Sequence, residues 1–369
     1  MVKLLIPGDP LFAVSQEASL PKLHAGKSIA LISLGMGAYF IYLYHVGFQE
    51  VIRSLAHVNL SIFSIGIALA ILGVLFDALA WQRIARKFDF DVSTWDIFLI
   101  YLACIFMNNL IPSGSFSGET TRVYFLEKLS AESRIDKSSA TVAATRIITS
   151  IPFILGTAIG LIYLISSTDV PVWALAICSS IAGVLLLINI LFLGVCYADG
   201  WLERIVVVVI NWTEKLLRIH INRQVCLGIV RQFHQSMIAL IEHKRSLFIS
   251  TFWAVMGWLC MTMVAFVTFL SMGIEVPMRA VFAVYAVMIF LQMLPLLLPG
   301  GVGIVDIVMI TLFSAIGVPT HGAVAATILM RLIQLWMLTA LGGISMIYLV
   351  QKTSRMPAKP AMEILAKSF

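Results

Sequence analysis

Long apolar runs constrain this chain more than any other feature of its sequence. About 20 consecutive apolar residues cross a bilayer as a helix, so runs of this length predict membrane spans. The hydrophobic fraction of 60% and the charged fraction of 12% support this reading, since soluble domains hold about 25% charged residues. We therefore predict an all-α integral membrane protein. The runs are Ser28–Gly47, Ser61–Trp81, Trp95–Ile111, Thr141–Ser166, Val172–Ala198, Leu247–Met272, Arg279–Gly317 and Ala323–Val350.

One apolar run is interrupted by the stretch Leu294–Asp306, which reads LPLLLPGGVGIVD. Its two prolines remove backbone donors, and its three glycines adopt conformations that other residues avoid. A broken helix at membrane depth is tolerated only where protein or a water-filled cavity surrounds the break. Asp306 follows the break, and a carboxylate inside a membrane indicates a functional site. The alternative is a polar loop with Asp306 at the water interface.

The distribution of Lys and Arg predicts the orientation, because an excess of these residues marks cytoplasmic segments. Basic residues precede Ser28, follow Trp81, fill the polar stretch 199–245 and mark the tail. All of these lie on one face only if Trp95–Gly118 enters the membrane and returns, and if the second broken run does so from the opposite face. The sequence thus predicts six full spans plus two broken or re-entrant helical hairpins, with both termini cytoplasmic in the cell membrane.

The two halves of the chain show the same order of features. In residues 61–166 a span precedes the break Pro112–Glu119 and a span with Arg146, while residues 247–350 repeat this order and end in a span with Arg331. The string VAAT occurs at Val142 and again at Val324. Interrupted segments in two inverted repeats indicate a transporter binding site. The predicted divisions are a cytoplasmic segment 1–27, a transmembrane domain 28–350 with an interfacial amphipathic connector 199–246, and a cytoplasmic tail 351–369.

The two breaks and two arginines predict one anion-binding site. A helix that begins at a Gly-rich break directs N–H groups and a positive dipole end toward the break, and guanidinium groups suit phosphate. Glu119 and Asp306 are expected to pair with the arginines when the site is empty. The alternative is a set of static ion pairs between helices. Asp77 is interpreted either as a residue at the membrane–water interface or as a residue of the site. The predicted substrate-binding residues are Asn109, Glu119, Arg122, Arg146, Gln292, Gly300, Gly301, Gly303, Asp306 and Arg331.

Signatures of catalysis, metals and cofactors are absent from the sequence. The five cysteines form no CxxC pair, and no P-loop, Rossmann or metalloprotease motif occurs. We expect no metal site, no cofactor and no enzymatic activity. The net charge of +6 is explained by basic residues that flank membrane helices rather than by nucleic-acid binding.

The motifs NLIPSGSFSGE, which ends at Glu119, and PGGVGIVD, which ends at Asp306, resemble the transmembrane region of lysylphosphatidylglycerol synthases. This region defines a broad family of flippase-like membrane proteins, and the resemblance covers roughly Ser28 to Val350. The family usually has a glutamate where this chain has Asp306, and more glycine in the first motif. Only a short tail follows Val350, so we expect the flippase-like part to stand without the soluble domain that attaches the amino acid in the synthases.

The resemblance implies the translocation of a lipid. The expected substrate is an anionic phospholipid, an aminoacylated phospholipid or a polyprenyl-phosphate-linked sugar, and a lipid-modifying enzyme or glycosyltransferase is a possible partner. One alternative is a membrane enzyme that modifies a lipid head group with the two acids as general acid and base. Another is a non-transporting scaffold for a glycosyltransferase or synthase.

Overall fold

The structure is a computed structural model that describes residues 58–111, 116–130, 135–166, 242–293 and 299–354, with scattered positions from 53 to 56 and from 176 to 239. The predicted span Ser28–Gly47, most of Val172–Ala198 and both termini lie outside these residues. The described part is helical and contains no strand. It includes four helical segments that are long and apolar enough to cross a membrane, namely Leu60–Phe88, Ile135–Gly156, Lys244–Ser271 and Thr320–Ser354.

The first half of the described chain contains one long helix, a hairpin and a second long helix. These are α4 (Leu60–Ala85), which is extended by the short η1 (Arg86–Phe88), then α5 (Thr94–Leu110), α6 (Phe116–Leu129) and α7 (Ile135–Ser166). Side chains set the helix starts: Asn59 accepts hydrogen bonds from the first N–H groups of α4, and Ser93 accepts one from Asp96 in α5. The helices α4 and α5 each begin one residue before their predicted apolar runs, whereas α7 begins about one and a half turns before its run and α6 lies outside any predicted run.

The second half repeats this order with one further interruption. It consists of α11 (Lys244–Ser271), α12 (Met278–Met293), the short η2 (Pro299–Gly301), α13 (Ile304–Ala315), α14 (Thr320–Arg331), the π-helical η3 (Leu332–Met337) and α15 (Leu338–Ser354). The predicted break is confirmed, because α12 ends before the prolines and α13 starts after the glycines. The predicted final span is confirmed as one helical segment, Thr320–Ser354, although a π-helical turn that the sequence did not predict lies between α14 and α15.

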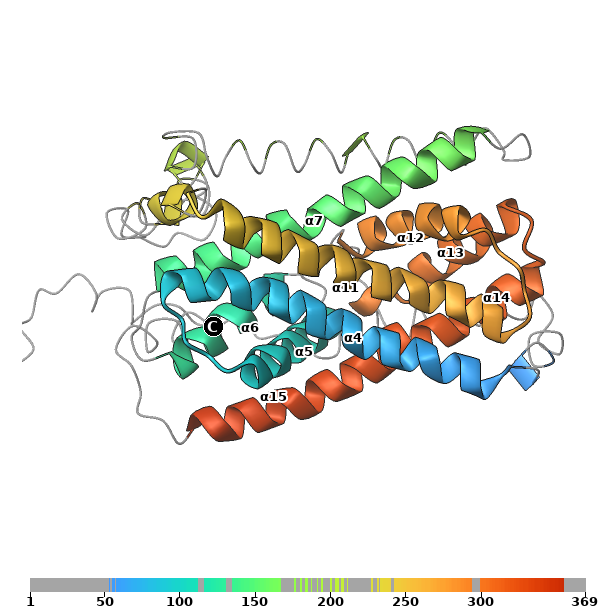
Figure 1. The fold of residues 1–369 in the computed structure, drawn as a ribbon, viewed down its shortest axis with the longest axis horizontal. Coiled ribbons are helices and arrows are strands. Elements are labelled where there is room, and N and C mark those ends of the chain that lie inside the picture. The colour runs from blue at the N-terminus through green and yellow to red at the C-terminus, as the bar shows by residue number, and fades with distance from the viewer. Residues whose placement is uncertain are drawn as a thin grey trace, which may run out of the picture.

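The four hairpin helices are too short to cross a bilayer. They have 17, 14, 16 and 12 residues, which at 1.5 Å per residue gives about 18 to 26 Å, against a hydrocarbon core of about 30 Å. Figure 1 shows the α5–α6 hairpin toward one end of the bundle and the α12–α13 hairpin toward the other. This is the arrangement expected for two hairpins that enter from opposite faces.

The two halves meet where α4 crosses α11. A Cβ atom added at Gly73 would lie 3.2 Å from the carbonyl oxygen of Gly257, and one added at Gly257 would lie 3.1 Å from the carbonyl oxygen of Gly73. The two glycines occupy the same position counted from the start of their helices, so the contact is reciprocal. The first hairpin helix of each half also packs against the last helix of the other half, α5 against α15 and α12 against α7. An inverted repeat would place equivalent elements of the two halves in such reciprocal contacts, but the repeat itself stays a prediction.

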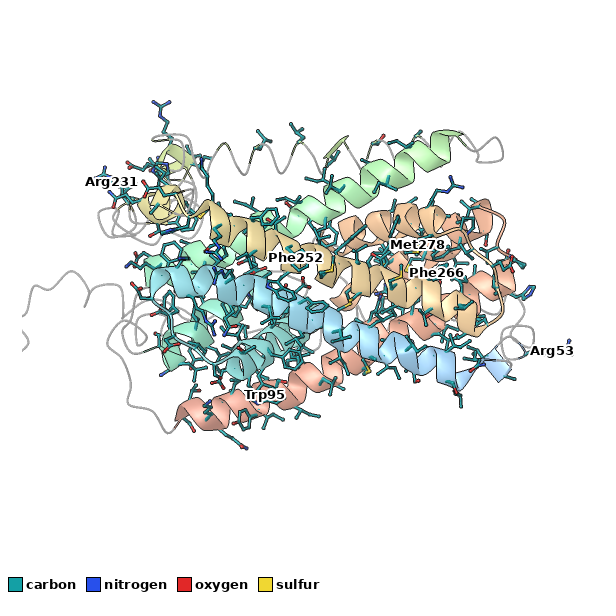
Figure 2. The ribbon with its side chains drawn as sticks, in the orientation of Figure 1. Arg53, Trp95, Arg231, Phe252, Phe266 and Met278 are labelled. Carbon is teal, nitrogen blue, oxygen red and sulfur yellow. The ribbon has the colours of Figure 1, made fainter. Side chains whose placement is uncertain are left out.

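The outside of the bundle is apolar, as contact with lipid tails demands. Large side chains such as Leu72, Ile162, Phe252 and Ile344 are exposed. The end of α4, the start of α11 and the end of α15 lie at one end of the bundle, and each carries basic residues (Figure 1). Arg231 lies at this end as well, whereas Arg53 lies at the other (Figure 2). The assignment of this end to the cytoplasm stays a prediction.

The predicted connector 199–246 contains a two-pronged surface salt bridge. The Nε and Nη2 atoms of Arg231 donate to the Glu203 carboxylate at 2.9 and 3.2 Å. This hydrogen bonding holds the pKa of Glu203 below its ordinary value. Residues 28 positions apart are thereby joined.

Candidate functional site

The second break is built by three glycines with left-handed backbones. The φ angles of Gly300, Gly301 and Gly303 are 61°, 64° and 90°, a region that residues with a Cβ atom seldom enter. This reversal lets α13 begin directly behind the break. The N–H of Gly303 donates to the Oδ2 atom of Asp306 at 2.8 Å, so the carboxylate caps the helix to which it belongs.

Arg331 closes the same break from α14. Its Nε atom donates to the Oδ1 atom of Asp306 at 2.5 Å, and its Nη1 atom donates to the carbonyl of Gly300 at 3.2 Å. Asp306 is 3% exposed and Arg331 is 7% exposed, so this is a buried charge pair. In the described part of the chain the buried Nη2 atom of Arg331 has no acceptor. The helix N-terminus that we predicted as an anion site is therefore occupied by the chain's own carboxylate.

The first hairpin places one carboxylate between two arginines. Glu119, in the first turn of α6, accepts from the Nη1 atom of Arg122 at 3.0 Å, and the Nη1 atom of Arg146 on α7 lies 3.6 Å from its other oxygen. The guanidinium of Arg122 lies over the rings of Trp81 and Tyr101, at 4.3 and 5.0 Å from their centroids. Such stacking stabilises a cation but satisfies none of its N–H groups.

Arg122 retains unused donors although it is only 2% exposed. Among the described residues, its buried Nε and Nη2 atoms have no hydrogen-bond acceptor. Arg146 is more open, with about a third of its side chain exposed. The cluster of Glu119, Arg122 and Arg146 thus carries one net positive charge and unfilled hydrogen-bond donors.

The neutral polar residues near the two breaks make contacts within the chain, and their part in substrate binding stays a prediction. Asn108, rather than Asn109, stands at the first break, where its Oδ1 atom accepts from the N–H of Gly118 at 2.7 Å. Asn109 instead donates to Thr339 at 2.8 Å and joins α5 to α15. Gln334, in the π-helical turn, donates to the carbonyl of Met261 and to the hydroxyl of Tyr285. The side chain of Gln292 lies outside the described residues.

The two halves position their acid–arginine pairs in the same way. In each, the acid lies in the first turn of the second hairpin helix and pairs with an arginine of the next helix. Thr145 and Thr327, the last residues of the two VAAT strings, are fully buried and both donate to the carbonyl four residues earlier. The pairs differ in charge, because the pair in the second half is balanced while that in the first includes the additional Arg122.

Sequence reasoning missed Trp81 and Tyr101, which hold Arg122, and the capping role of Asn108. No sequence pattern distinguishes these aromatic residues from others in the apolar runs. Within the described ranges, no group of three or more His, Cys, Asp or Glu side chains is placed to hold a metal ion.

This arrangement defines a class, that of all-helical integral membrane proteins with two opposed hairpins and an acid–arginine pair behind each tip. The sequence pattern of the lysylphosphatidylglycerol synthase transmembrane region matches residues 28–342, and the chain belongs to this family. It is 28% identical to the UPF0104 membrane protein PH1989 of Pyrococcus horikoshii over 326 residues, which cover 86% of this chain and 96% of that protein.

Two further relatives share nearly their full length with this chain. A UPF0104 membrane protein of Methanothermobacter thermautotrophicus is 26% identical over 86% of this chain and 94% of its own length. The UPF0104 membrane protein MJ1595 of Methanocaldococcus jannaschii is 26% identical over 92% of this chain and 99% of its own length. Their names state a membrane location and no activity.

Proposed function

We propose that this protein moves a lipid with a phosphate-bearing head group between the two leaflets of the membrane. One observation carries the proposal: at the first hairpin, Arg122 and Arg146 share the single carboxylate of Glu119, and buried donors of Arg122 remain without an acceptor in the described structure. The family to which the chain belongs supports a membrane role.

A phosphate diester supplies what this cluster lacks. Its oxygens accept several hydrogen bonds at once, and its negative charge balances the excess guanidinium. Buried donors without acceptors are costly, so a ligand that satisfies them is bound in preference to lipids without a charged head group. The acyl or prenyl tails stay in the bilayer, because the bundle exterior is apolar. Anionic phospholipids, aminoacylated phospholipids and polyprenyl-phosphate-linked sugars all share this phosphate chemistry.

In this role the protein is a carrier that releases the lipid without chemical modification. The alternative role as an enzyme requires free carboxylates for general acid and base work. In the described structure both candidate acids are engaged by arginines, which favours binding over proton transfer to a substrate.

The test uses the full chain reconstituted in vesicles that contain a labelled phosphatidylglycerol or a labelled polyprenyl phosphate. Exposure of the head group is followed with a quencher that does not cross the membrane. We expect Arg146→Gln to slow translocation about tenfold or more, since a charge-assisted hydrogen bond is worth about 1.5–3 kcal/mol. Arg245→Gln, at an exposed position at the start of α11, is the matched control and should transport normally.

Two results would overturn the proposal. One is a translocation rate in Arg146→Gln equal to that of the unmodified protein. The other is a mass-spectrometric change in the recovered lipid, which would favour the enzyme. Phosphatidylcholine carries a phosphate but no net charge, so a labelled form distinguishes selection for net negative charge from selection for phosphate alone. Separate vesicles for each lipid identify which tail and head group are accepted.

A further inference from the structure

A carboxylate in the middle of the bundle has no role in either acid–arginine pair. Asp77 lies on α4 one turn beyond the crossing with α11, and it is half-buried. In the described part of the chain, no hydrogen bond or salt bridge is formed by its side chain. Its Oδ1 atom lies 2.5 Å from the position that a Cβ atom would take at Gly257, so the carboxylate packs directly against this glycine of α11.

The reciprocal contact between the halves shows that packing alone does not require an acid here. Met261 occupies the position on α11 that corresponds to Asp77 on α4. Its Cγ atom lies 3.1 Å from the Cβ position of Gly73, just as Asp77 is seated on Gly257. An apolar side chain therefore fills this place in one half. Helix packing at this contact therefore does not explain why the other half has a charged carboxylate, that of Asp77.

Asp77 lies between the two charge networks. Arg122 of α6 and Tyr101 of α5 interact with it electrostatically from the first network, and Tyr285 of α12 does so from the second. Cys260 of α11 is the remaining ionisable neighbour. On α7, which also packs against α4, Arg146 is paired with Glu119, and η3 carries no ionisable side chain. Arg122 is thus the cation that the charge of Asp77 influences.

We propose that Asp77 is a proton-binding site that couples proton movement to the lipid translocation proposed above. A bare carboxylate at membrane depth is costly, and a bound proton removes its charge. A sodium ion would need several oxygen ligands, and the described residues provide no cluster of acids around Asp77. The inference rests on the proposed function and adds the ion that accompanies the lipid.

The charge state of Asp77 changes the anion site. When Asp77 is ionised, its charge offsets the excess positive charge of the Glu119, Arg122 and Arg146 cluster. When the carboxylate takes a proton from water at one face, the excess is restored and a phosphate is bound more tightly. The proton is released to water at the other face together with the lipid. Proton and anionic lipid are therefore carried in the same direction.

The first test detects the proton directly in the purified full chain. Infrared difference spectra, recorded from mildly alkaline to mildly acidic pH, should show the carbonyl stretch of a protonated acid. This band should disappear in Asp77→Met and persist in Asp91→Asn, which changes an exposed carboxylate in the loop after α4. Asp77→Met copies the residue at the equivalent place in α11, and a thermal melt checks that it folds. A band of full intensity in Asp77→Met would overturn the assignment.

The second test measures coupling in vesicles with a pH difference. A gradient of about one pH unit drives up to about a tenfold lipid asymmetry for each proton carried. We expect this asymmetry in the unmodified protein and its loss in Asp77→Met. A protein that moves lipid without response to the gradient refutes the coupling alone, whereas a protein that moves no lipid refutes the proposed function as well. A response to sodium instead of pH would replace the proton by a metal ion and refute the assignment.

Discussion

The buried pair of Asp306 and Arg331 allows a prediction that separates a structural ion pair from a ligand-binding one. Arg331→Gln leaves Asp306 with a single donor, the N–H of Gly303, and leaves the carbonyl of Gly300 without the Arg331 donor. Removal of one partner from a buried pair costs about 3–5 kcal/mol, since the other charge stays buried. We expect Asp306→Asn to cost a similar amount and the double variant to cost clearly less than the sum.

The pair of Glu119 and Arg146 provides the matched comparison within the same protein. Its atoms are 3.6 Å apart and its side chains are 21% and 34% exposed, and pairs of this kind contribute about 0–1 kcal/mol. Arg146→Gln should therefore leave the melting temperature almost unchanged while it slows lipid movement. Arg331→Gln should lower the melting temperature and impair transport as a consequence.

The measurement is a double-mutant cycle for each pair by thermal unfolding in detergent, with transport measured on the same preparations. A coupling energy for Glu119 and Arg146 that equals or exceeds the one for Asp306 and Arg331 would refute this division of roles. So would stable but inactive variants Arg331→Gln and Asp306→Asn, because the second pair would then act on the substrate.

Three further predictions concern packing, the break and orientation. Gly342→Ala should destabilise the protein by about 1–3 kcal/mol, because its Cβ would lie 2.3 Å from a carbonyl oxygen of α5, whereas Gly343→Ala meets its nearest atom at 3.3 Å and should melt near the original temperature. Gly301→Leu should abolish lipid movement with little effect on membrane insertion, since φ is 64° and a side chain there is strained; normal transport would show that the break is an ordinary loop. Single cysteines at Ser354 and Ser167 should be labelled from outside at Ser167 only, and the reverse pattern would invert the predicted topology.

The break and its charges were predictable because local chemistry determines them. Two prolines and three glycines close together interrupt a membrane helix, and a charge at membrane depth requires a partner. The sequence therefore predicts both the interruption before Asp306 and the pairing of acids with arginines. The roles of these residues in substrate binding stay predictions, since the structure shows their contacts with each other and not with a lipid.

The remaining details depend on the relative placement of distant helices. Asn108 and Asn109 are neighbours on α5, and only the packing of α6 and α15 decides that the first faces the break and the second faces Thr339. The rings that hold Arg122 come from α4 and α5, which the sequence does not bring together. The π-helical turn after Arg331 is also missed, because its sequence, LIQLWM, reads as ordinary apolar helix.

The reciprocal contact of Gly73 and Gly257 shows that the two halves pack in the same way at this point. Differences between their side chains at equivalent positions are therefore not required by packing and indicate function. An inverted pair with identical side chains would offer the same site to both faces of the membrane. Here the additional Arg122 and the carboxylate of Asp77 both belong to the first half, where the second half has a balanced pair and Met261. The α5–α6 hairpin consequently carries the excess positive charge, whereas Asp306 balances the charge of Arg331 at the α12–α13 hairpin. Two hairpins that differ in this way are not interchangeable in a transport cycle, and we expect the substrate phosphate to be held first by the α5–α6 half.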